Sequence, residues 1–217
     1  AFLPDGETLI FLTGSPDVTA NVWNWKEEKE IRSFPSRGFV IELSPDGTKL
    51  VTGGYASPEH NKNDDKARIY DMETGQLLHG LPGHEKGATS FSFSPNGKSV
   101  ATAGPSTPVR IWDTSSGKEL RSLGTFPQNK PDVRGIEYSK KGDKLAVCYA
   151  PTRPQSSAGN APNQMIAPVV LWDCDTWEIL HRYGLNQVQV QMGFLPGDKG
   201  FITADVYGTV RWWELPR

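Results

Sequence analysis

The sequence predicts an all-β fold built from repeated four-stranded antiparallel sheets. Three observations predict it: a short run that contains an aromatic residue recurs along the chain, a four-residue turn recurs in phase with that run, and glycine and proline are abundant. The chain has 22 glycines and 17 prolines among 217 residues, above their usual shares of about 7% and about 5%. Many short strands joined by tight turns account for all three observations.

The aromatic run is clearest at Val109–Asp113, which reads Val-Arg-Ile-Trp-Asp. Related runs place an aromatic ring at the same position five times in all, and we term this set the aromatic column: Trp23, Tyr70, Trp112, Trp172 and Trp213. Successive members are 47, 42, 60 and 41 residues apart. Because the rings recur in phase, we predict a structural role for them, on the third strand of each sheet and between neighbouring sheets.

The recurring turn precedes the aromatic run in every repeat. It reads Leu-Pro-Asp-Gly at 3–6, Ser-Pro-Asp-Gly at 44–47, Ser-Pro-Asn-Gly at 94–97 and Ser-Lys-Lys-Gly at 139–142, with a degenerate copy at 195–198. Proline fixes φ at the second position, and glycine closes the turn without a Cβ penalty. Each copy therefore predicts a tight connection between two strands.

The third repeat shows the predicted order of strands most clearly. Residues 88–93, 99–103, 109–112 and 118–123 read as four strands separated by turns and one short loop. Four antiparallel strands in about forty residues form one blade of a propeller. The other repeats predict strands at 9–12 and 22–23; at 39–43, 49–52, 68–70 and 76–79; at 135–138, 145–148, 169–172 and 178–181; and at 190–194, 200–203 and 210–213.

These motifs together resemble the WD-repeat (WD40) β-propeller family. Gly83-His84, the Ser-Pro-Asn-Gly turn and the run Val109–Asp113 follow one another as the family pattern does, and the resemblance covers essentially the whole chain. It implies a single propeller segment over 1–217 with five four-stranded blades, the first and last incomplete. The expected blades are approximately 1–37, 38–82, 83–125, 126–184 and 185–217.

The number of blades predicts an open arc. Seven blades of about forty residues need roughly 280 residues, and the chain has 217. We therefore expect a fragment of a longer propeller protein, with the five blades forming part of a ring of seven or more. An unclosed array leaves strand edges and an apolar sheet face without partners.

The resemblance also implies a hydrogen-bond relay from each ring of the aromatic column. In the family, the ring bonds a Ser or Thr of the second strand, which bonds a His and then an Asp. Thr102 and His84 match this relay in the third blade, but Ser106 stands where the Asp is expected. Asp17 and Asp64 match the Asp position in the first two blades, without the His. We therefore expect the relay to be incomplete in every blade.

Two long loops, at 55–66 and 149–168, lie between the second and third strands of their blades. Because the blades are equivalent, both loops should emerge on one face, which the resemblance implies to be the partner-binding face. Segments 57–66 and 151–163 are the expected carriers of binding. The residues expected to contact a partner are Lys86, Arg134, His60, Asn63, Asp65, Arg153, Gln155 and Asn160.

Composition and missing motifs exclude several functions. The formal charge of −2 argues against nucleic-acid binding. The sequence contains no run of eighteen or more apolar residues, so we expect no membrane insertion. We find no metal-ligand spacing, no nucleophile elbow and no phosphate-binding loop, so we expect no cofactor and no metal. Carboxylates lie mainly in turns, and we expect no acid–base pair on the inner strands. Cys148 and Cys174 are too far out of register for a disulfide, and free thiols favour a cytoplasmic location.

The sequence therefore predicts a non-catalytic scaffold that binds another protein, or another domain of its own chain, through its loop-rich face. The alternative is the propeller portion of a multidomain enzyme, such as a peptidase, another hydrolase, a kinase or a haem protein, with its catalytic residues outside this segment. Because one fold supports many functions, the partner itself does not follow from the pattern.

Overall fold

The computed structural model describes residues 1–14, 17–54, 67–124, 132–150, 169–184 and 189–216. Within these residues the chain forms five antiparallel sheets and one 3-10 turn, η1 (Pro196–Asp198). The first sheet contains β1 (Thr8–Thr13), β2 (Thr19–Asn24) and β3 (Lys29–Pro35). The second contains β4 (Val40–Leu43), β5 (Lys49–Gly53), β6 (Ala67–Asp71) and β7 (Leu77–Leu81).

The remaining three sheets follow in chain order. The third contains β8 (Ser90–Phe93), β9 (Ser99–Ala103), β10 (Val109–Asp113) and β11 (Glu119–Leu123). The fourth contains β12 (Val133–Tyr138), β13 (Lys144–Tyr149), β14 (Val169–Asp173) and β15 (Ile179–Tyr183). The fifth contains β16 (Gln189–Phe194), β17 (Gly200–Asp205) and β18 (Val210–Glu214). The predicted all-β class of four-stranded antiparallel sheets is confirmed, and we keep the blade boundaries and the single-domain division as a proposal.

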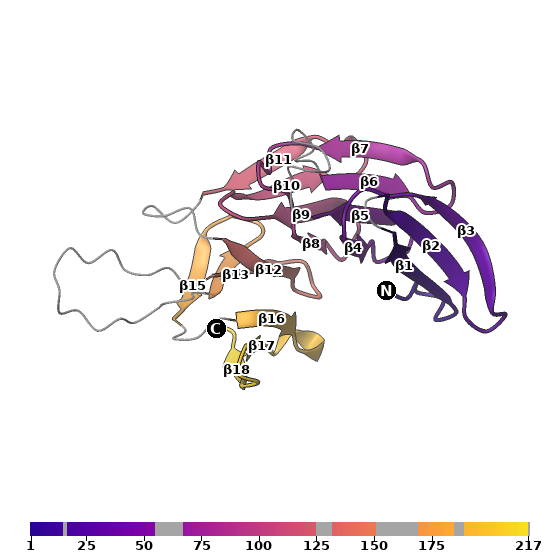
Figure 1. Cartoon of the computed structure of the whole chain (residues 1–217). Helices are drawn as coiled ribbons and strands as arrows, with labels where there is room; N and C mark the ends of the chain where they lie inside the picture. Colours follow the sequence, from indigo (N-terminus) through magenta and orange to yellow (C-terminus); the bar gives the residue numbers. More distant parts are fainter. Residues whose placement is uncertain (15–16, 55–66, 125–131, 151–168, 185–188, 217) are drawn as a thin grey trace.

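The first and last sheets have three strands each, as predicted. Before β1, the chain makes only an isolated bridge, between Phe2 and Leu9, where the other sheets have an inner strand. The last sheet ends at β18, without a fourth strand in the described residues. Figure 1 shows the five sheets following one another along an arc that does not close between the first and the last.

The core lies between neighbouring sheets, and the third sheet buries apolar residues on both of its faces. In β10, Trp112 packs towards the second sheet with Ile69 and Leu81. Val109 and Ile111, on the opposite face of β10, pack towards the fourth sheet. The third strand of this blade, β10, therefore has apolar residues on both faces and packs against the blades on either side.

The first four recurring turns form as predicted, with glycine at the left-handed φ that closes each one. Gly47, Gly97 and Gly142 have φ values of 71°, 68° and 78°. In the turn at 44–47, Asp46 accepts hydrogen bonds from the Ser44 hydroxyl (2.6 Å) and from the Thr48 N–H (3.0 Å). The Ser44 bond is the main reason why the pKa of Asp46 falls to about 2.

The two cysteines are free, as predicted. Cys148 pairs with Val169 near one end of the β13–β14 ladder, whereas the Cys174 N–H bonds the Asp143 carbonyl beyond the other end. Burial raises the pKa of each thiol to about 12. Neither thiol is therefore an activated nucleophile at neutral pH.

One face of the final sheet is not covered by another sheet in the described part of the chain. Val109 and Ile111 in β10 are each 1% exposed, because the next sheet covers them. Val210 and Trp212, at the same positions in β18, are 64% and 63% exposed.

The described residues contain no helix long and apolar enough to span a membrane.

Candidate functional site

A buried hydrogen-bond relay runs inward from Trp112 in the third blade. The Trp112 Nε1–H donates to Thr102 Oγ1 (2.8 Å), and Thr102 Oγ1 lies 2.7 Å from His84 Nε2. His84 is fully buried, and its Nδ1 lies 2.8 Å from Thr107 Oγ1. Thr107, and not Ser106, therefore occupies the terminal position of the relay.

The backbone at Ser106 explains this difference. Ser106 has a left-handed φ of 58°, and its N–H bonds Asp132 Oδ1 (3.0 Å) instead of the relay. The next residue, Thr107, is then directed at His84. A neutral threonine hydroxyl stands where the family pattern has a carboxylate.

The other blades show the relay in partial form. Trp213 Nε1–H donates to Thr203 Oγ1 (3.0 Å) in the fifth blade. In the fourth blade, the buried Nε1 of Trp172 has no partner among the described residues, because Val147 occupies the position of Thr102 and Thr203. Tyr70 is buried, and Trp23 is half-buried. Asp17 is exposed, with no hydrogen bond to Trp23 in the described part of the chain, and Asp64 lies outside it.

The inner strands β4, β8 and β12 share one direction, so their first residues lie at one end of the molecule, which we term the loop end. Lys86 and Arg134 are exposed there. The Lys86 Nζ donates to Ser106 Oγ (3.4 Å), and Ser106 in turn bonds Asp132, so the third and fourth blades are joined at this end. Phe39, just before β4, is 61% exposed.

Phe39 was missed by the sequence analysis. Its signal was available: a large apolar residue stands immediately before β4, at the repeat position that Arg134 holds at the start of β12. The other residues expected to contact a partner lie outside the described residues. They are His60, Asn63, Asp65, Arg153, Gln155 and Asn160.

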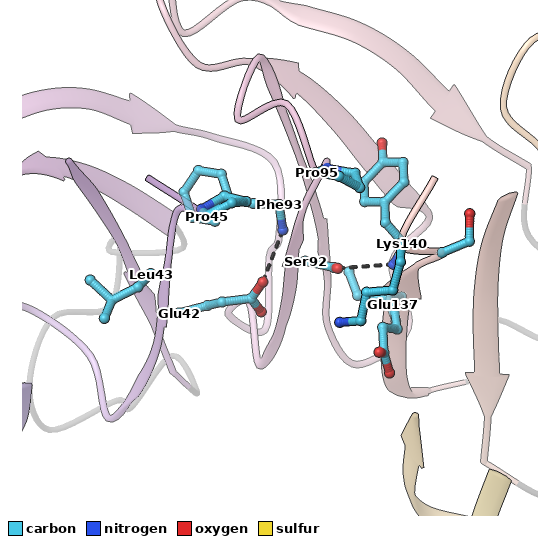
Figure 2. A pocket seen from close by; sticks show the side chains of 11 residues that line it. Glu42, Leu43, Pro45, Ser92, Phe93, Pro95, Glu137 and Lys140 are labelled. Carbon is cyan, nitrogen blue, oxygen red and sulfur yellow. Dashed lines mark hydrogen bonds between the residues drawn. The ribbon is translucent and has the colours of Figure 1, made fainter. Parts of the chain in front are cut away.

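The opposite end of the inner strands, which we term the turn end, has a hollow of about 500 Å³. It is formed by the last residues of β4, β8 and β12 and by the turns that follow them (Figure 2). Glu42 and Glu137 line it from β4 and β12, with Ser92 of β8 between them. The expectation that no carboxylate pair converges on the inner strands is therefore wrong.

Glu42, Ser92 and Glu137 also link the blades. Glu42 Oε1 accepts the Phe93 N–H (2.9 Å), and Ser92 Oγ accepts the Tyr138 N–H (3.0 Å). Glu137 Oε1 accepts the Phe194 N–H (3.2 Å). Each residue stands two positions before the first residue of its turn, and each bonds the inner strand of the next blade. The shared position was visible in the sequence, but the lateral contact was not.

Burial changes the acidity of both carboxylates. It raises the pKa of Glu42 to about 7, with a further contribution from the charge of Glu137, while the Phe93 N–H and Lys140 oppose the shift. Burial likewise raises the pKa of Glu137, and the negative charge of Asp198 raises it further. Near neutral pH, Glu42 therefore gains or loses a proton readily. The described residues contain no group of three or more His, Cys, Asp or Glu arranged to hold a metal ion.

Comparison with protein families identifies the repeat. Residues 75–113 match the family model described as "WD domain, G-beta repeat". This region contains the relay residues His84, Thr102 and Trp112. This match supports the predicted WD-repeat family. The repeated turns and the aromatic column extend the same pattern over the other four sheets of this WD-repeat chain.

Individual relatives match the WD-repeat chain over longer stretches. It is 31% identical over 120 residues to the meiotic recombination protein rec14 of Schizosaccharomyces pombe, covering 54% of this chain and 36% of rec14. It is 26% identical over 158 residues to the small ribosomal subunit protein RACK1 of Caenorhabditis elegans, covering 68% and 46% of the two chains.

A third relative is the WD repeat-containing protein VIP3 of Arabidopsis thaliana, with 24% identity over 192 residues. That match covers 87% of this chain and 56% of VIP3. The WD-repeat chain thus spans between about a third and somewhat more than half of the length of these relatives.

Proposed function

We propose that this WD-repeat chain is a non-catalytic interaction module that binds a protein partner, or another domain of its own chain, at the loop end. The observation that carries the proposal is the exposure of Phe39, Lys86 and Arg134, which lie at or shortly before the starts of three successive inner strands. The loop end thus combines an aromatic ring with two cationic side chains.

The chemistry of these side chains favours a protein partner. Aromatic residues and arginine dominate the energetics of protein interfaces, because they bury a large area with few rotatable bonds and form several hydrogen bonds. A partner segment with an apolar side chain beside a carboxylate would fit this surface. The overall charge of −2 offers no comparable attraction for a nucleic acid.

The contacts at the loop end suit a rigid binding surface. Lys86 bonds Ser106, and Ser106 bonds Asp132, so the connections of two blades hold one another. Residues 55–66 and 151–168 have the same repeat position as residues 104–108, between the second and third strands. We therefore extend the proposal to the six other residues expected to contact a partner: His60, Asn63, Asp65, Arg153, Gln155 and Asn160.

A charge-reversal experiment tests the proposal. Partners retained by the immobilised intact protein are quantified by mass spectrometry for the wild type, for Phe39→Ser combined with Arg134→Glu, and for Lys98→Glu. Lys98 is an exposed lysine at the turn end and serves as the matched control. The loop-end variant should retain at least about tenfold less of its partner than the wild type, which is the effect of removing a single interface hot spot. Equal retention by all three proteins would contradict the proposal.

A further inference from the structure

The turn-end hollow lies at the opposite end of the inner strands from the proposed partner surface. Its shape follows from one repeat position, which holds Glu42, Ser92 and Glu137 in three successive blades. The serine is short and the glutamates are long, so the middle of the three positions leaves room between two carboxylates. Figure 2 shows Glu42 and Glu137 on either side of Ser92.

The carboxylates have unused capacity to accept hydrogen bonds. Oε1 of each glutamate accepts a backbone N–H of the next blade. Among the described residues, the second oxygen of each glutamate accepts no hydrogen bond, although a carboxylate can accept about four. Lys140 also lines the hollow, and its charge acts on both glutamates. Two carboxylates against one ammonium group leave a negative balance when both acids are ionised.

The walls of the hollow are suited to an alkyl stem. Pro45 and Pro95 of the two neighbouring turns line it, together with Phe93 and Tyr138 at the ends of β8 and β12. A ligand that presents a cation on an apolar stem would pack its stem against these rings and direct its charge at the glutamates.

We propose that the hollow binds the basic side chain of a partner peptide, with arginine preferred. A guanidinium group is planar and carries five N–H donors, so it can bond two separate carboxylates and stack on a ring at the same time. The ammonium group of lysine is smaller and more strongly hydrated, so it bridges two carboxylates less well. This site does not depend on the partner proposed for the loop end.

The acidity of the site makes binding dependent on pH. Burial raises the pKa of Glu42 to about 7, so this residue is largely protonated in acid and ionised in base. The charged groups around the two glutamates are Lys140, on the turn after β12, and Asp198, on η1. Affinity for a cation should therefore increase as the pH rises through neutrality.

The test uses N-acetyl-arginine amide and its neutral isostere, N-acetyl-citrulline amide, as probes. Both are titrated into the intact protein at pH 8, and the backbone N–H signals of Phe93, Tyr138 and Phe194 are followed by NMR. The arginine probe should shift these three signals and should bind at least about tenfold more tightly than the citrulline probe, the factor expected for a charge-assisted hydrogen bond. Equal binding of the two probes, or shifts confined to other residues, would overturn the proposal.

Two variants should change the affinity for the arginine probe in opposite directions. Glu42→Gln combined with Glu137→Gln retains an acceptor for each backbone N–H and should weaken the arginine probe about tenfold or more. Lys140→Met removes the competing cation from an exposed side chain, so it should tighten binding about threefold and leave the fold unchanged. Glu178→Gln, an exposed glutamate outside the hollow, is the matched control. An unchanged affinity in both the double glutamine variant and Lys140→Met would also refute the site.

Discussion

Val147→Thr should supply the missing partner of a buried indole. In the fourth blade, Trp172 Nε1 is buried and has no hydrogen bond in the described residues. In the third and fifth blades, the equivalent indoles donate to Thr102 at 2.8 Å and to Thr203 at 3.0 Å. Leu145 pairs with Trp172 as Val100 pairs with Trp112, so a threonine at position 147 would stand where Thr102 stands.

The magnitude follows from two opposing contributions. A hydroxyl group buried without a partner costs about 1–3 kcal/mol in proteins. The new bond to Trp172 should recover about 1–2 kcal/mol, because it satisfies a polar N–H that is already buried. Val147→Thr should therefore leave the free energy of unfolding within about 1 kcal/mol of the wild type. Val169 is equally buried but faces the fifth blade, so Val169→Thr should lose about 1–3 kcal/mol.

Urea unfolding of a double-mutant cycle would measure this bond. In a Trp172→Phe background the indole N–H is absent, so Val147→Thr should become as costly as Val169→Thr. The coupling energy between positions 147 and 172 should be about 1–2 kcal/mol and favourable. If the cost of Val147→Thr is the same with and without the indole, the alignment of the blades is incorrect at this position.

Three further predictions concern the core, the hollow and the open sheet face. Trp112→Ala should reduce the free energy of unfolding by about 3–5 kcal/mol because the ring is 2% exposed. Trp177 is half-buried and lies in a turn outside the aromatic column, so Trp177→Ala should reduce this free energy by less than half as much. Similar urea midpoints for the two variants would contradict the structural role of the aromatic column. Glu42 has a folded-state pKa of about 7 against an ordinary value of 4.5, so the folded protein holds this proton more tightly than the unfolded chain. The resulting stability is complete below pH 4.5 and is lost as the pH rises towards 7, by up to about 3 kcal/mol; Glu42→Gln should remove this slope, and an unchanged slope would exclude Glu42 as its source. Lysine in place of both Val210 and Trp212 should reduce self-association of the 217-residue chain in analytical ultracentrifugation, because these side chains form the uncovered face of the last sheet; a wild-type chain that is monomeric throughout would refute this prediction.

The repeat could be predicted from the sequence because its signals are local. Turn glycines require a left-handed φ, strands alternate, and the ring of the aromatic column recurs at the same place in each sheet. These signals together were sufficient for the all-β class, the four-stranded sheets and the incomplete first and last blades. The free thiols followed in the same way, because antiparallel register can be counted along two adjacent strands.

Tertiary structure decided the details that depend on contacts between blades or on one backbone angle. The left-handed φ of Ser106 directs Thr107 to His84, and no periodicity distinguishes two adjacent polar residues in a short loop. Glu42 and Glu137 belong to blades on either side of the third blade, and they meet only because the inner strands stand side by side around the arc. Local periodicity thus determined what each blade is, whereas lateral packing of blades determined which of their polar side chains share one hollow.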